Sequence, residues 1–513
     1  MRTPTPTNTP AWAVHRRPES DIPLETEAAR RYLRRGNLPQ ALLHRGPGPA
    51  LKVGEVTLSH EELWFAAQAA ANRLVDAKLP SAGNVALFAG NSLEWIVSYL
   101  GLQVLGWTVV GMNPAYKADE ARHILSDSQA SAVLVDEDRE ALATSLTGAL
   151  PKLDHVVRVD GIAGRSGPTH LRAFGSQATS ESPALILYTS GTTGLPKGAL
   201  LDHGNLLAQA RGVVEAWRWS PSDRLVLALP LFHVHGLGIA LHGSLIAGGC
   251  AVLIPFDPEA VVRELHSGGT MFFGVPAMYQ RLVEHLERHP ADLSGVRLFV
   301  SGSAPLPPAL FERCARVLGQ PVLERYGITE GGIVVSNPYD GPRHAGRVGY
   351  PLPGVEVRLG EQDEVQLKAG QVFSGYWRNE AATREVFVDG WMRTGDIGEI
   401  GEDGTLAIRG RIKELIISGG YNVYPREVEL VLEQHPAVAE VAVVGLPSER
   451  WGEEVTAFVV RKDQVEPDEL IKFARERLAT YKCPRAIRFI EHLPRNAMGK
   501  IQRSALAEEG RAT

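Results

Sequence analysis

A loop rich in glycine and hydroxyl residues is the clearest candidate for chemistry in this chain. It follows a short apolar run, Ala184 to Tyr188, of the kind that forms a buried strand. Glycines let backbone N–H groups approach an anion, hydroxyls add donors, and a lysine adds a mobile cation. The loop residues are Thr189, Ser190, Gly191, Thr192, Thr193, Gly194 and Lys197. Together they predict a polyphosphate site.

The spacing in this loop differs from that of an ordinary P-loop. Pro196 stands where a Gly-Lys-Ser/Thr run would have to begin. A flexible linker is the alternative interpretation, but a linker would not follow directly on a buried strand with a lysine in register. The pattern therefore favours phosphate handling by a loop of another class.

A second group of polar residues follows a predicted strand, in the phrase YGITE. An aromatic face can stack on adenine, a hydroxyl can hold a phosphate oxygen, and a carboxylate can bind the Mg²⁺ that accompanies ATP. Tyr326, Thr329 and Glu330 supply these groups within five residues. Glu330 could instead be a carboxylate at a helix start.

Two further residues suit a ribose. A carboxylate grips a diol because both of its oxygens accept hydroxyl hydrogens. Asp396 lies in the turn RTGD, with Arg411 as its expected companion. The alternative is an Asp that only forms the turn.

Three phrases give the chain a specific resemblance: YTSGTTGLPKG, RYGITE and the terminal PRNAMGK. They resemble the signature motifs of the adenylate-forming superfamily, which includes acyl- and aryl-CoA synthetases, carrier-protein adenylation domains and luciferases. The resemblance implies ATP, Mg²⁺ and coenzyme A as the small molecules used. It assigns Tyr326 to adenine, Thr329 to phosphate and Glu330 to the metal. Lys500, otherwise an ordinary surface lysine, would contact the substrate carboxylate and the α-phosphate.

The same resemblance implies the remaining site residues. His233 would be a wall at the junction of acyl pocket and pantetheine tunnel; with His235 it could also bind a metal, but no third ligand is near in the sequence. Lys413 would be the hinge, within residues 411–414. The other expected residues are Ser303, Glu324, Arg325 and Gly327 for the nucleotide, Ser418, Gly419 and Gly420 for the CoA passage, and Ile246, Gly248 and Gly302 beside His233 in the acyl pocket.

Composition excludes several classes of partner. The chain has 513 residues, 44% of them hydrophobic, and a net charge of −6, so nothing attracts it as a whole to nucleic acid or to an anionic membrane. No run approaches the roughly 20 apolar residues of a membrane span. Its three cysteines lie far apart, which favours a reducing cytoplasm over a disulfide framework.

The pattern of elements predicts an α/β fold with two domains. Apolar runs alternate with amphipathic stretches from residue 53 onward, which indicates doubly wound sheets with flanking helices. The expected division is a loose arm at 1–20, a large domain at 21–410 with a β-barrel-like part, and a small mobile α+β domain at 411–513. The oligomer, monomer or homodimer, is left open.

The expected activity is ATP-dependent acyl-CoA ligation through an acyl adenylate. Coenzyme A is the expected acceptor because the chain ends at Thr513 with no carrier-protein segment. A ligase that loads a free-standing carrier protein is the main alternative. A luciferase-like monooxygenase is less favoured, and a non-catalytic scaffold would be expected to lack Lys500 or Glu330.

The acid is the least determined feature. Over its length the chain is similar to malonyl-CoA synthetases, in phrases such as LFHVHGL and GGYNVYP. Members of that branch resemble one another in carrying an arginine in the stretch that here runs from Leu245 to Gly249, which has no basic residue. The sequence therefore predicts an apolar acid of secondary metabolism, with room for a bulky cyclic, terpenoid or aryl group. Malonate is the alternative if Arg297 or Arg343 reaches the pocket.

Overall fold

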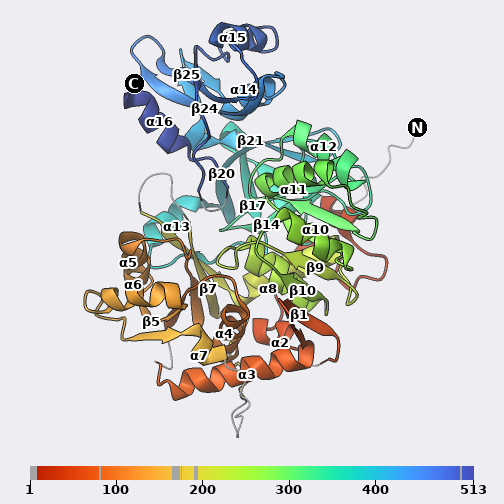
Figure 1. Cartoon of the computed structure of the whole chain (residues 1–513), viewed down its shortest axis with the longest axis vertical. Helices are drawn as coiled ribbons and strands as arrows, with labels where there is room; N and C mark the ends of the chain where they lie inside the picture. The colour runs from red at the N-terminus through yellow and green to blue at the C-terminus, as the bar shows by residue number, and fades with distance from the viewer. Residues whose placement is uncertain are drawn as a thin grey trace.

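The computed structural model describes residues 9–44, 46–79, 83–163, 174, 176–189, 195–496 and 499–512. Figure 1 shows a large lower body and a small α+β domain above it, which contains the C-terminus. In the described residues, no helix combines the length and apolarity needed to cross a membrane. The predicted fold class is confirmed.

The first sheet of the large body has seven strands and carries the glycine-rich loop. In order across the sheet they are β18 (Gly375–Tyr376), β8 (Lys197–Asp202), β7 (Pro183–Thr189), β4 (Thr108–Gly111), β3 (Asn84–Phe88), β5 (Ala130–Val135) and β6 (His155–Arg158). Strands β7, β4, β3, β5 and β6 are parallel.

Helices cover both faces of this sheet because successive strand residues point to opposite sides. Val85 and Leu87 join the cluster under α3 (His60–Asp76), α4 (Leu93–Val104) and α7 (Val159–Ala163), whereas Ala86 and Phe88 join the cluster under α5 (Ala118–Asp127) and α6 (Glu137–Thr147). Ser92 caps the N-terminus of α4, since its Oγ accepts a hydrogen bond from the Trp95 N–H at 3.0 Å.

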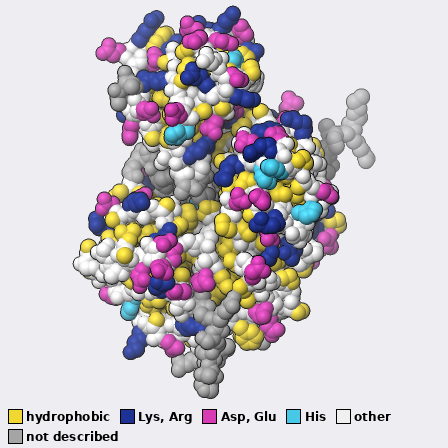
Figure 2. All heavy atoms as spheres, viewed as in Figure 1, with side chains coloured by type: hydrophobic (Ala, Val, Ile, Leu, Met, Phe, Trp, Pro, Cys, Tyr) yellow, Lys and Arg dark blue, Asp and Glu magenta, His cyan; other side chains and the backbone are white. Residues whose placement is uncertain are grey.

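The second sheet has nine strands. Across the sheet they are β15 (Tyr350–Pro351), β14 (Gly332–Ser336), β13 (Leu323–Ile328), β12 (Leu298–Ser301), β11 (Met271–Gly274), β9 (Arg224–Leu227), β10 (Cys250–Leu253), β1 (Pro49–Val53) and β2 (Val56–Ser59). On one face lie α10 (Pro258–His266), α11 (Pro276–Arg288) and α12 (Pro308–Leu318). The other face shares a core with the first sheet through α8 (His203–Ala216), η2 (His235–Leu241) and α9 (His242–Ile246). Figure 2 shows hydrophobic side chains along the junction between the part of the large body built on the seven-stranded sheet and the part built on the nine-stranded sheet.

Two smaller, largely antiparallel sheets complete the molecule. One contains β16 (Glu356–Leu359), β17 (Glu364–Lys368), β19 (Phe387–Val388), β20 (Trp391–Ile400) and β21 (Leu406–Arg411), with η3 (Glu361–Asp363) and α13 (Glu380–Val386) beside it. After η4 (Ile412–Glu414), which contains Lys413, the small domain has β22 (Ile416–Ser418), β23 (Tyr421–Val423), β24 (Val438–Ser448), β25 (Gly452–Arg461) and β26 (Ala486–Phe489), packed by α14 (Pro425–Leu432), α15 (Pro467–Arg475) and α16 (Arg503–Ala512).

The N-terminal arm is packed from residue 9 onward, so the prediction of a loose arm is wrong for its described part. The segment contains η1 (Ala11–His15) and leads into α1 (Thr26–Leu33) and α2 (Leu38–Leu42). Trp12 is 1% exposed and packs with Leu33 and Ala208. Arg17 donates to the backbone oxygens of Glu215, Val214 and Trp219. The Trp12 indole and the Arg17 guanidinium therefore hold this segment to α8, although the sequence of the segment shows no helix or strand pattern.

Trp12→Ala should therefore destabilise the large domain. Removing a buried indole costs about 3 kcal/mol through lost burial and the cavity that remains. Urea unfolding followed by tryptophan fluorescence and circular dichroism measures the change. Val14→Ala is the matched control, because Val14 lies in the same segment and is 48% exposed. Equal midpoints for the two variants would contradict a structural role for the arm.

Candidate functional site

Many of the predicted site residues, though not all, lie where the carboxyl ends of several strands meet the small domain. Thr189 is the last residue of β7, Gly302 and Ser303 follow β12, and Tyr326 lies in β13. Ligands of open α/β sheets bind at this edge because the strand ends and their loops leave a crevice there. Five residues of the glycine-rich loop, Ser190, Gly191, Thr192, Thr193 and Gly194, lie outside the described residues.

Asp396 is the centre of the expected ribose end. The Tyr326 hydroxyl donates to Asp396 Oδ2 at 2.6 Å, and Arg411 Nε contacts Oδ1 at 2.9 Å. Asp396 and Arg411 lie opposite each other in the ladder between β20 and β21. Each carboxylate oxygen keeps a second lone pair. The carboxylate is thus fixed in place and can still accept hydroxyl hydrogens from a diol.

Glu330 lies at the edge of the glycine-rich loop. Its Oε1 accepts hydrogen bonds from Thr189 Oγ1 at 3.1 Å and from the Tyr376 hydroxyl at 3.0 Å. Both partners are neutral, so the carboxylate charge remains for a cation. Mg²⁺ in nucleotide sites commonly takes one or two protein carboxylates together with substrate phosphates and water. This set of donors fits the predicted metal role.

Lys500 is buried close enough to both Asp396 and Glu330 for their charges to act on its ammonium. Burial and the charge of Arg411 lower the pKa of its ammonium, while Asp396 and Glu330 act in the opposite direction. Its backbone N–H donates to Asn496 Oδ1 at 3.0 Å, and the preceding Gly499 has φ +72° and lies against Ala277 at the start of α11. The small domain therefore presents this lysine to the nucleotide end of the site.

A buried cation, Arg325, lies beside Gly302, a residue predicted for the acyl pocket. Arg325 is 5% exposed and its guanidinium lies on Gly302, where an added Cβ would stand 2.3 Å from Cζ. Its Nε and Nη2 atoms are buried without a hydrogen-bond partner in the described part of the chain. Burial lowers the pKa of Arg325 to about 9, so the group is still charged at neutral pH. The sequence prediction that Arg325 binds the nucleotide stays a prediction, and nothing in the sequence indicated that its guanidinium packs against Gly302.

Two histidines complete the wall beside Arg325. Burial, and then the charges of Lys500 and Arg325, lower the pKa of His233 to about 3, so this imidazole is neutral. His235 Nδ1 lies 3.1 Å from Ser303 Oγ. A neutral His233 suits the predicted role as a wall of the pocket.

The structure does not bring Ile246 and Gly248 to this place. They precede β10, whereas His233 follows β9, and these neighbouring strands are parallel. The two segments therefore lie at opposite ends of the strands. Gly248 approaches Pro221 and His44 instead. The prediction that these residues line the acyl pocket with His233 and Gly302 is wrong, and the missing arginine of that stretch gives no information about the acid.

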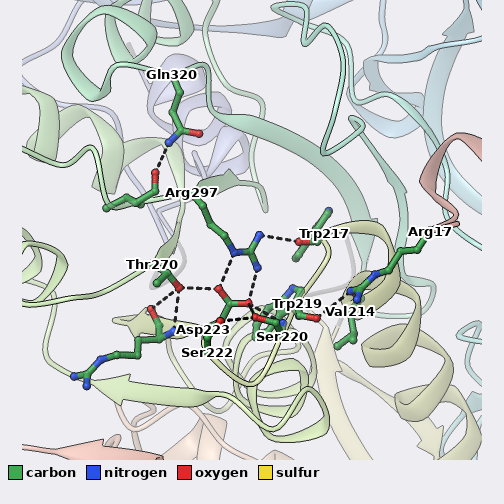
Figure 3. Close-up of polar contacts among 12 residues, drawn as sticks. Arg17, Val214, Trp217, Trp219, Ser220, Ser222, Asp223, Thr270, Arg297 and Gln320 are labelled. Carbon is green, nitrogen blue, oxygen red and sulfur yellow. Dashed lines mark hydrogen bonds and ion pairs between the residues drawn. The ribbon is translucent and has the colours of Figure 1, made fainter. Parts of the chain in front are cut away.

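The two arginines considered as substitutes are engaged elsewhere. Arg297 contacts both carboxylate oxygens of Asp223 at 2.7 Å and donates to the Trp217 carbonyl, as Figure 3 shows. Arg343 donates to the backbone oxygens of Pro321 and Tyr339. Neither guanidinium reaches the pocket.

The predicted CoA passage is also apart from the site in this arrangement. Ser418, Gly419 and Gly420 form the end of the β22–β23 hairpin in the small domain, where the Gly419 N–H donates to the Trp451 carbonyl at 2.8 Å.

A cavity of about 190 Å³ lies at the junction of the two domains. It is lined by Leu229, Pro230, Phe256, Val275, Ala277, Met278, Arg281 and Gly499.

Comparisons with known proteins agree with the resemblance found in the sequence motifs. The model of the AMP-binding enzyme family matches residues 41–377, and that of the AMP-binding enzyme C-terminal domain matches residues 427–500. A long-chain-fatty-acid–CoA ligase of Salmonella typhimurium is 35% identical over 84% of this chain and 86% of its own length. A malonate–CoA ligase of Arabidopsis thaliana is 34% identical over 82% and 77%. The crystal structure of ATP-bound MatB from Rhodopseudomonas palustris superposes with a TM-score of 0.85 at 34% identity, covering 93% of this chain and 99% of that one.

A pH-dependent stability effect follows from Glu324. Its Oε1 accepts from the Leu306 N–H at 3.0 Å, its Oε2 is buried without a partner among the described residues, and burial raises its pKa to about 7. The unfolded chain ionises near the ordinary value, so ionisation destabilises the folded state increasingly as the pH rises to about 7, by about 3 kcal/mol. Glu324→Gln should therefore raise stability at pH 8 and leave it unchanged at pH 4.5.

Denaturant unfolding at the two pH values tests this expectation. Glu312→Gln on the exposed side of α12 is the matched control and should show no pH-dependent gain. The assignment is wrong if Glu324→Gln changes stability equally at both pH values.

Proposed function

Because the chain belongs to the AMP-binding enzyme family and is an AMP-forming acid–thiol ligase, we propose that the acid it activates carries a second anionic group, as malonate does. The observation that supports this substrate class is the buried guanidinium of Arg325, which lies beside Gly302 and whose Nε and Nη2 atoms have no hydrogen-bond partner among the described residues. A buried unpaired charge costs several kcal/mol. A second carboxylate would compensate it, whereas a purely apolar acid would leave it unpaired.

An apolar monocarboxylic acid is the second candidate. The relatives include a ligase named for long-chain fatty acids as well as one named for malonate. The cavity at the domain junction is lined mainly by apolar side chains, among them Phe256, Val275 and Met278. This lining would suit an alkyl or ring substituent if the cavity is continuous with the acyl pocket.

The reaction has two half-reactions. In the first, a carboxylate oxygen of the acid attacks the α-phosphorus of ATP, giving acyl-AMP and pyrophosphate. In the second, the CoA thiol attacks the acyl carbon and AMP leaves. Mg²⁺, when bound with ATP, neutralises phosphate charge, and Glu330 would hold it. Thr329 lies on the turn between β13 and β14. Together with Lys500 of the small domain, it would stabilise charge at the α-phosphate without a covalent enzyme intermediate.

A movement of the small domain would separate the two half-reactions. Lys500 occupies the nucleotide end here, while the hairpin at Gly419 and Gly420 is exposed. Rotation about η4, with Lys413 as pivot, would withdraw Lys500 and bring the hairpin to the thiol passage. The compartment we propose is the reducing cytoplasm, since all three cysteines are unpaired and buried.

Lys500→Ala should abolish acyl-adenylate formation and leave thioester formation from supplied acyl-AMP largely intact. Loss of one electrostatic contact of this kind costs about 10²–10³ in rate. Pyrophosphate release measures the first half-reaction, and CoA-thioester mass from synthetic acyl-AMP measures the second. Equal loss in both would refute a role confined to adenylation. Omitting CoA and adding a carrier protein in the second assay distinguishes the two acceptors.

Arg325→Met should lower kcat/KM for malonate by about 30- to 1,000-fold, the effect of removing one partner of a buried charge pair. Values for butyrate and octanoate should stay the same or rise, because those acids never used the charge. Arg224→Met is the matched control: Arg224 also has a buried Nε without a partner in the described structure, but it begins β9, at the other end of the strand from His233.

The substrate proposal fails if the wild-type enzyme prefers an apolar acid over malonate in a panel of dicarboxylic, medium-chain, aryl and polycyclic acids. It also fails if Arg325→Met lowers kcat/KM for all acids by the same factor, which would indicate a structural role for the guanidinium. Pyrophosphate release and CoA-thioester mass should be measured for every acid.

A further inference from the structure

Tyr376 contacts two charged side chains of the predicted site, Glu330 and Lys197. Its hydroxyl donates to Glu330 Oε1 at 3.0 Å. Its ring faces the ammonium of Lys197, which lies 5.4 Å from the ring centroid. One side chain therefore contacts the carboxylate expected to hold Mg²⁺ and the cation expected to hold phosphate, the first by a hydrogen bond and the second through its π face.

The ring of Tyr376 is held in place by its surroundings. Strand β18 pairs with β8, so that Tyr376 lies opposite Ala199, two residues after Lys197. Its backbone N–H donates to Thr383 Oγ1 at 2.9 Å, and the Phe373 ring packs edge-on against it at 4.9 Å between centroids. The position of the hydroxyl is consequently set by the sheet and by neighbouring packing.

The hydroxyl of Tyr376 is one of two hydroxyl donors to the Glu330 carboxylate. Tyr376 and Thr189 both donate to Oε1 of Glu330, from β18 and from the end of β7 respectively. Two donors from separate strands fix the rotation of the carboxylate and leave Oε2 outside both bonds.

We propose that Tyr376 is a positioning residue for the metal-bound triphosphate: its hydroxyl orients Glu330 toward Mg²⁺, and its ring holds Lys197 at the phosphate side. The inference rests on the proposed function, and specifically on Glu330 as the metal carboxylate. Groups that orient metal ligands affect metal affinity by about 10- to 100-fold when removed. Tyr376 thus determines how much Mg²⁺ strengthens ATP binding.

Tyr376→Phe tests the inference because it removes only the hydroxyl and keeps the ring over Lys197. The readout is the dissociation constant for ATP by calorimetry on the full-length enzyme, without acid or CoA, once with saturating Mg²⁺ and once with EDTA. The variant should bind ATP about 10-fold more weakly in Mg²⁺ and equally well in EDTA. The Mg²⁺ concentration that gives half-maximal pyrophosphate release should rise by a similar factor.

Tyr188→Phe is the matched control. Tyr188 lies in β7 next to Thr189, and its hydroxyl donates to Asp127 at 2.6 Å, away from Glu330. It should leave both dissociation constants unchanged. Equal weakening in Mg²⁺ and EDTA by Tyr376→Phe would overturn the inference, because it would show a packing role only. The same shift in Tyr188→Phe would overturn it as well.

Glu330→Ala separates the two levels of the proposal. If this variant keeps the full Mg²⁺ effect on ATP binding, Glu330 is not the metal carboxylate. The metal role of Glu330 and the positioning role of Tyr376 then both fail. If Glu330→Ala loses the Mg²⁺ effect but Tyr376→Phe does not, only the role of Tyr376 is refuted. In the double variant the two effects should not add, because the hydroxyl acts through the carboxylate.

Discussion

The buried carboxylate of Asp396 ties the parts of this molecule together. It is 3% exposed, and its two oxygens are bonded by Tyr326 from β13 and by Arg411 at the end of β21. A buried charge is tolerated only when it is paired and hydrogen-bonded, so both partners are needed. Since β13 belongs to the nine-stranded sheet and β21 leads directly into η4, one ionic network joins the nucleotide end of the site to the start of the proposed hinge.

The parts of the site that the sequence predicted share one physical property. Thr189, Tyr326 and Asp396 each lie at a strand or strand end, and regular strand patterns are visible from apolar runs and turn residues. Thr189 and Tyr326 lie in the carboxyl-terminal parts of β7 and β13, which belong to two different sheets, and Asp396 lies within the antiparallel strand β20. The packing of these sheets against one another brings the three residues together, and the strand patterns do not show that packing. The large α/β body and the small α+β domain followed from the same patterns.

The wrong predictions and the residues that the sequence analysis did not find also have physical causes. Ile246 and Gly248 lie near His233 in the sequence, but they precede a strand whereas His233 follows its parallel neighbour, so a strand length separates them. Proximity along the chain is a poor guide across a parallel pair. Trp12 was missed because one buried side chain anchors a segment without periodicity. Tyr376 was missed because β18 has two residues, too few to show a pattern, and the contact that matters joins it to another sheet.

The charges around the site are unbalanced in a way that fits the reaction. Lys500, Arg325 and Arg411 face a region in which Asp396 and Glu330 are the acidic side chains that act on Lys500. The pKa values of Lys500 and Arg325 are lowered, and His233 is held neutral by burial and by these same two cations. Such a region is electrostatically costly when it is empty. A triphosphate and a carboxylate substrate bring the negative charge that it lacks, so the repulsion among the cations favours binding of both anions side by side. That is the condition an adenylation site must meet, because the two reacting groups repel each other in water.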